Sequence, residues 1–290
     1  MKNPAKGFCA LSLIMASTIV EGQIPGILGD TNPPTNGLYQ KDTITRDVPL
    51  AFLRQADVMW AQRIWRVIDL REKQNLSFYY PITPTPDRKS LWEIITKALK
   101  SGQLAAYEDN TIVDPDNTFD VRLTKDKIEQ IIEPVDSGEV DDNGNPVPPL
   151  PNPITADKIR GYMLKEDWFF DKQRSLMDVR IIGIAPIAVS INKNTKTEDT
   201  SGTISPLFWI YFPQIRPILV RYEAFNPHNQ AQRNTFDAVF WKRQFSSYIF
   251  MESNVYNRLL QSYSIGIDRL LEGERIKKKM FDIEQDMWQY

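Results

Sequence analysis

The clearest hydrophobic period in the first half of the chain runs through residues 50–74, where apolar positions recur at helical spacing. At 100° per residue, Ile64, Trp65 and Ile68 share one stripe, and Trp60 lies beside it. The two tryptophans are about 140° apart around such a helix. The pattern therefore predicts a helix with a wide apolar surface and one tryptophan at its edge.

Two further segments of the N-terminal half show the same period. Residues 88–104 predict a helix that Asp87 caps and Gly102 stops, and residues 125–134 predict a shorter helix that begins after Thr124. This half of the chain is therefore predicted to be mainly helical.

The period changes in the second half of the chain. Residues 177–192, 205–213 and 215–225 are β-branched and aromatic runs of strand length, with a polar loop at 192–203, and residues 235–245 predict a short helix. Helices followed by strands and then helices predict an α+β fold. We expect a helical N-terminal half and an antiparallel β-sheet with flanking helices in the C-terminal half.

Residues 273–290 predict an amphipathic C-terminal helix. Its apolar positions are spaced by four, three and four residues: Ile276, Met280, Ile283 and Met287. Phe281 and Trp288 lie one heptad apart beside this stripe. The stripe indicates docking, either on the chain's own domain or on a partner subunit.

The N-terminus has the pattern of an export signal. Two lysines precede an apolar run at residues 8–20, which is too short to span a bilayer comfortably. We expect a secretory signal peptide over residues 1–22, with a buried N-terminal helix as the alternative. Cleavage would remove Cys9, the only cysteine, so the mature chain would hold no disulfide and no cysteine-ligated metal. In a host with two membranes, such a chain would be periplasmic.

Composition divides the rest of the chain into four parts. Residues 23–48 are rich in proline, glycine, asparagine and threonine and predict an extended arm. A helical subdomain at 49–133 is followed by a proline-rich acidic linker at 134–155. Residues 156–290 then form an α+β subdomain that ends in the amphipathic helix.

Candidate chemistry is sparse. His228 is the single histidine, and neither a zinc cluster nor a glycine-rich phosphate loop is present. Glu139, Asp141 and Asn143 resemble half of an EF-hand loop, but Leu150 stands where a bidentate glutamate is required. These positions favour turn chemistry over calcium binding, and no cofactor is expected.

Charge and hydropathy argue against nucleic-acid binding and against a membrane-spanning segment. The net charge is −2, and removal of Lys2, Lys6 and Glu21 with the signal peptide makes it −3. A nucleic-acid-binding protein usually shows a basic excess. No run of 18 apolar residues follows the signal peptide, so no transmembrane segment is expected.

The stretch "ADVMWAQRIWRVIDLREKQNLSFYYP" (56–81), followed by "SLWEIITKALKSGQLAAYED" (90–109), resembles the GldN/PorN family of the Type IX secretion system. The resemblance implies a non-enzymatic periplasmic subunit that joins a GldK/PorK-type outer-membrane lipoprotein in a ring under the outer membrane. It also implies neighbouring copies of the chain in that ring and force received from the GldM/PorM-type arm of the motor. The resemblance further implies that this ring supports protein secretion and gliding motility.

The residues expected near a partner interface are aromatic, arginine and methionine side chains of two segments: Trp60, Arg63, Trp65, Arg66, Arg71, Tyr79, Tyr80, Met280, Phe281, Met287 and Trp288. Two other functions stay open. A carbohydrate- or peptidoglycan-binding module would show exposed coplanar aromatics, and a carboxylate glycosidase would need two acids at a set separation.

Overall fold

The computed structural model describes most of the chain after the expected arm: residues 46–85, 88–109, 119–136, 150–188, 206–226, 229, 233–255 and 258–288. The chain from Ile44 onwards forms one compact unit. The expected signal peptide, the arm up to residue 45, Asp87, the acidic loop at 137–149 and His228 lie outside the described residues.

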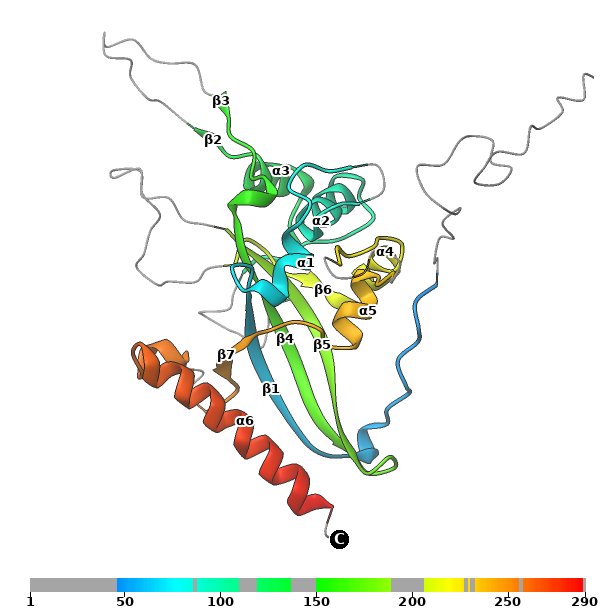
Figure 1. Ribbon diagram of the computed structural model, residues 1–290, viewed down its shortest axis with the longest axis vertical. Helices are drawn as coiled ribbons and strands as arrows, with labels where there is room; N and C mark the ends of the chain where they lie inside the picture. The colour runs from blue at the N-terminus through cyan, green and yellow to red at the C-terminus, as the bar shows by residue number, and fades with distance from the viewer. Residues whose placement is uncertain are drawn as a thin grey trace, which may run out of the picture. The chain divides into compact units, whose positions relative to one another are not determined.

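A five-stranded antiparallel sheet runs through this unit, in the order β6-β5-β4-β1-β7 (Figure 1). Its strands are β1 (Val58–Asp69), β4 (Ile159–Asp171), β5 (Leu176–Ala188), β6 (Ile210–Tyr211) and β7 (Tyr248–Glu252). A separate pair joins β2 (Val135–Asp136) to β3 (Leu150–Pro151). With the helices beside it, this sheet confirms the predicted α+β class.

The helices of the described chain are α1 (Leu76–Tyr79), α2 (Leu91–Lys100), α3 (Lys125–Ile132), α4 (Phe212–Leu219), α5 (Phe236–Trp241) and α6 (Ile267–Met287). Short 3₁₀ turns occupy Gln55–Asp57, Lys73–Asn75, Ala156–Lys158 and Leu260–Ser262. The helices predicted at 88–104, 125–134 and 235–245 and at the C-terminus are confirmed. The predicted cap, Asp87, is wrong, because Ser90 caps α2 by accepting a hydrogen bond from the Glu93 N–H at 3.3 Å; Gly102 follows the helix at φ +74° as predicted.

The helix predicted over residues 50–74 is wrong, because residues 58–69 form β1. This strand lies between β4 and β7, and every residue from Ile64 to Ile68 is buried. Apolar side chains are needed on both faces of such a strand, so strict alternation is lost. The resulting run imitates the spacing of an amphipathic helix.

A second prediction is also wrong, because a predicted strand is a helix in the structure. The run at 215–225 was expected to be a strand, but Phe212–Leu219 forms the helix α4. Pro213 stands in its first turn, where the missing N–H costs nothing, and Pro217 lies inside it. Ile215 and Leu219 are four residues apart and both fully buried, so packing overrides the β-branched composition.

Both halves of the chain contribute to the same sheet. β1 pairs with β4 along most of its length, for example Ile64 with Glu166 and Ile68 with Tyr162. The N-terminal half therefore supplies a strand inside the sheet as well as helices.

One face of the sheet holds the largest core. Ile68, Leu164 and Ile184 pack there against side chains of α1, α2, α4 and α5, including Phe78 and Phe236. Further along β1, Ile64 contacts α6 instead. In Figure 1, α6 runs beside β1 on the side away from α5.

Gly161 of β4 gives a stability prediction. A Cβ at Gly161 would lie 2.4 Å from the Ile68 carbonyl oxygen, whereas a Cβ at Gly273 of α6 would make only ordinary contacts from 3.6 Å outwards. Gly161→Ala is expected to lower the free energy of unfolding by about 1–3 kcal/mol, the usual cost of overpacking. Gly273→Ala should leave it unchanged or raise it by up to about 1 kcal/mol. Urea denaturation of both variants measures this, and equal effects would contradict the contact.

Candidate partner interface

β1 carries four of the residues expected at an interface. Trp60 and Trp65 are five residues apart in a regular stretch of strand, so they lie on opposite faces of the sheet. Trp60 is half-buried beside the cluster formed by Ile64, Ile276 and Met280. Trp60 and Met280, distant in sequence, are thus brought together.

Trp65 lies in the core of the opposite face. Its side chain is 0% exposed and packs with Val67, Met163 and Trp209. The ammonium of Lys165 lies 5.7 Å from its ring centroid, a cation–π arrangement. Trp65 therefore belongs to the core and contributes no surface in this fold.

The two arginines of β1 are occupied by internal contacts. Arg63 forms a bidentate pair with Asp167 of β4, at 2.7 Å and 3.0 Å. Arg66 is buried, and its Nε and Nη2 donate to the side chain and carbonyl of Ser247 at 3.0 Å and 3.2 Å. Burial lowers the pKa of Arg66 from its usual value, an effect that the nearby Glu166 partly offsets.

The residues after β1 lie at the surface around α1. Arg71 pairs with Asp69 at 2.6 Å; partial burial raises the pKa of Asp69, but the hydrogen bonds from Arg71 outweigh this and hold the pKa below its usual value. Tyr79 is half-buried and meets Tyr80 edge to face at 5.1 Å. Tyr80 is partly exposed, and its ring lies 6.3 Å from that of Phe225.

α6 contacts the sheet through one face only. Ile276 and Met280 are buried against Ile64 and Ile249, and Met287 is half-buried. Phe281, about 140° around the helix from Ile276, is 56% exposed, and Trp288 is 65% exposed. The predicted inner stripe therefore docks on the chain's own sheet, while the two aromatic residues beside it remain at the surface.

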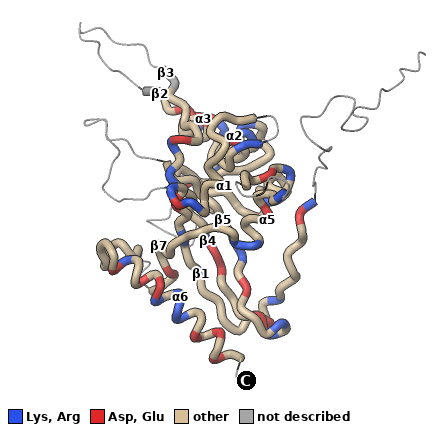
Figure 2. Tube along the Cα trace, viewed as in Figure 1, with Lys and Arg blue, Asp and Glu red and all other residues tan. Residues whose placement is uncertain are grey.

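The exposed apolar side chains of α6 form a second line, of which the sequence predicted only Phe281 and Trp288. We call the following residues the outer stripe: Ile267, Leu270, Leu271, Phe281 and Trp288. Each is more than half exposed. A seven-residue spacing could have revealed this line from the sequence, because it joins Ile267, Glu274, Phe281 and Trp288. Figure 2 shows charges of both signs along the same helix.

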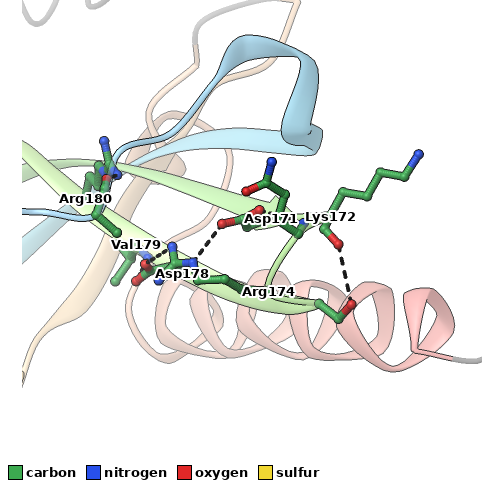
Figure 3. Close-up of polar contacts among 9 residues, drawn as sticks. Asp171, Lys172, Arg174, Asp178, Val179 and Arg180 are labelled. Atoms are coloured by element: carbon green, nitrogen blue, oxygen red, sulfur yellow. Dashed lines mark hydrogen bonds and ion pairs between the residues drawn. The ribbon is translucent and has the colours of Figure 1, made fainter.

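A hollow of about 530 Å³ lies between β5, α4, α5 and residues 49–51. Its rim includes Arg174, which bridges Asp171 at 2.7 Å and Asp178 at 2.9 Å (Figure 3). The hydrogen bond from Arg174 holds the pKa of Asp171 below its usual value. Asp178 also accepts from the backbone N–H of Val179 at 2.8 Å. This cluster fixes the outer side of the hollow.

The eleven expected residues therefore do not form one continuous patch. Trp65 and Arg66 are buried, Arg63 and Arg71 pair with acids of the same chain, and the aromatic residues of α6 lie apart from those of α1. The sequence predicted neither the exposed apolar residues in the first turns of α6 nor the hollow beside β5.

Within the described ranges, no three potential metal-ligating side chains gather at one point. Nor does any described helix have the length and hydropathy needed to cross a bilayer.

Comparison with known protein families gives a match that covers most of the chain. The family described as gliding motility associated protein GldN matches residues 53–289. No curated protein matches the chain.

Proposed function

The chain belongs to the GldN family of gliding-motility-associated proteins, and from this premise we propose that it is a non-enzymatic structural subunit of a periplasmic ring. In this proposal a GldK/PorK-type lipoprotein holds the ring at the outer membrane, and neighbouring copies of the chain build it. A GldM/PorM-type motor arm delivers force to it. The ring would serve Type IX protein secretion and gliding motility, and the predicted signal peptide would bring the chain to the periplasm.

The outer stripe of α6 is the observation that carries this proposal. A helix of 21 residues that covers one apolar face and leaves a second one in solvent is typical of a subunit with a partner. The stripe holds two aromatic side chains, the residue type enriched at interface hot spots. A ring also needs two different patches on each subunit, because head-to-tail contacts are heterologous.

Co-expression with the lipoprotein tests the proposal. We expect the two chains to co-elute in size-exclusion chromatography, with a mass by light scattering that requires several copies of each. A wild-type chain that never co-elutes with the lipoprotein would contradict the proposal.

A matched pair of variants links the complex to the outer stripe. Changing Phe281 and Trp288 together to glutamate is expected to reduce the mass of the complex, because two charges would have to be desolvated in the contact. Val255, which is 96% exposed and outside α6, serves as the control. Val255→Glu should leave the mass unchanged, and equal losses in both variants would remove the stripe from the interface.

A further inference from the structure

The hollow beside β5 combines an apolar lining with a ring of arginines. Its apolar wall includes Leu50, Val179, Ile181, Phe212, Phe240 and Trp241. Its polar lining consists of Arg174, Arg180, Arg216, Arg243, Asp178 and Asp237. Three of these arginines pair with acids of the same chain, whereas Arg180 donates to the backbone carbonyl of Ala51. A hollow of this size accepts a few side chains, and this lining suits an aromatic residue beside a carboxylate that reaches Arg180.

One wall of the hollow is a short segment that arginines hold by its backbone. Arg216 donates to the Val48 carbonyl at 2.7 Å, and Arg180 donates to the Ala51 carbonyl. Leu50 of this segment lines the hollow, and its neighbours Val48 and Phe52, which do not line it, are 62% and 87% exposed. Exposed apolar side chains therefore flank the lining residues of this segment in the sequence.

The C-terminal part of α6 has the complementary chemistry. Phe281 and Trp288 are exposed, and the exposed carboxylates Asp282 and Asp286 lie between them in sequence. Two turns of helix separate the aromatic residues, about 10 Å along the axis. An amphipathic helix laid in a groove is a common mode of recognition.

The chain's own α6 cannot present these aromatic residues to its own sheet. Its inner face is fixed by the buried Ile276 and Met280, and Glu284 accepts a hydrogen bond from the backbone N–H of Met177 at 3.3 Å. The outer stripe is therefore turned away from the surface on which α6 rests. A second molecule is needed to bring such a helix to the hollow.

We propose that the hollow beside β5 receives the Phe281–Trp288 end of α6 from a second copy of this chain. The aromatic side chains enter the apolar part of the hollow. Arg180 then donates to the carboxylate of Asp282 instead of the backbone carbonyl of Ala51. An ionised carboxylate is the stronger partner for a guanidinium. The inference rests on the proposed function, since it supplies one contact between neighbouring copies.

Single-cysteine variants of the full chain test the contact. Cys9, the only cysteine, is first changed to serine. A copy with Leu50→Cys is mixed with a differently tagged copy with Gln285→Cys under mild oxidation. We expect a disulfide between the two tags in at least about tenfold higher yield than with Gln103→Cys, an exposed position next to α2.

Two further changes identify the side chains responsible. Trp288→Ala should lower the cross-link yield at least about tenfold at an unchanged melting temperature, because it removes a hot-spot aromatic. Arg180→Glu in the first copy should lower it similarly, and Asp282→Arg in the second copy should restore part of the yield. Failure of both, or a yield equal to that of the Gln103 control, overturns the inference.

The outcome is separable from that of the proposed function. Co-elution with the lipoprotein but no cross-link between copies would overturn the docking site alone. A cross-link between copies without lipoprotein binding would overturn the proposed function and leave the contact in place.

Discussion

Replacing Trp65 with alanine is expected to lower the free energy of unfolding by about 3–5 kcal/mol, the cost of removing a large aromatic side chain from a packed core. Trp65 is fully buried among Met163, Trp209 and Phe250, and Lys165 is placed against its ring. The change would leave a cavity and would also remove the aromatic face that accompanies a buried ammonium.

Trp60→Ala is the matched control on the same strand. Trp60 is only half-buried, at the edge of the small cluster under α6, so its truncation should cost clearly less. Urea denaturation followed by circular dichroism measures both variants, because fluorescence would change with the loss of either tryptophan. Equal losses would show that the two faces of β1 are equally packed, against the burial seen here.

The two tryptophans also show where sequence reasoning reaches its limit. The pattern placed both on one wide apolar surface of a helix, whereas the strand β1 puts them on opposite faces of the sheet. A strand with Ile64 to Ile68 buried has no clean period of two, and chance placement of Trp60, Ile64 and Ile68 supplies intervals of four. Only the pairing with β4 and β7 distinguishes the alternatives, and those partners lie about 100 and 190 residues away.

α2 and α6 were predictable because their signals are local. α2 has a polar cap, an apolar face and a glycine stop within 13 residues, from Ser90 to Gly102. α6 shows its inner stripe through Ile276 and Met280. The sequence predicted only Phe281 and Trp288 of the outer stripe, because Ile267, Leu270 and Leu271 precede the amphipathic pattern of residues 273–290.

The hollow beside β5 could not be predicted in the same way. Its lining comes from residues 49–51, from β5, from α4 and from α5, segments far apart in the sequence. Arg216 lies in a run that was expected to form a strand, so even the correct neighbours of this guanidinium depended on recognising α4. Sites of this kind follow from packing between elements.

Arg243→Ala is expected to lower the free energy of unfolding by about 3–5 kcal/mol, the range for breaking a buried ion pair from one side. Glu166 is fully buried within β4, and Arg243 approaches both of its carboxylate oxygens, at 2.9 Å and 3.1 Å. Trp168 Nε1 also donates to this carboxylate at 3.0 Å. Without the guanidinium, the carboxylate would keep only the hydrogen bond from Trp168 and the nearby charge of Arg66, in a position that has no contact with water.

Arg243 also has a backbone conformation that is unfavourable for a residue with a side chain. It stands just beyond α5 with φ +52°, a left-handed conformation that few non-glycine residues adopt, and its guanidinium lies 5.3 Å from the Trp168 ring. The ion pair and the ring contact together offset that strain. Arg243→Lys should restore only part of the stability, because an ammonium cannot bind both carboxylate oxygens in a fork.

A double replacement separates the charge from the packing. Glu166→Leu combined with Arg243→Met removes both charges at similar volume and should recover most of the stability lost in Arg243→Ala. Arg71→Ala, which breaks the exposed pair with Asp69, should cost less than about 1 kcal/mol. If Arg243→Ala costs no more than Arg71→Ala in chemical denaturation, the burial of Glu166 does not hold in solution, and the contact between α5 and the sheet must be looser than described.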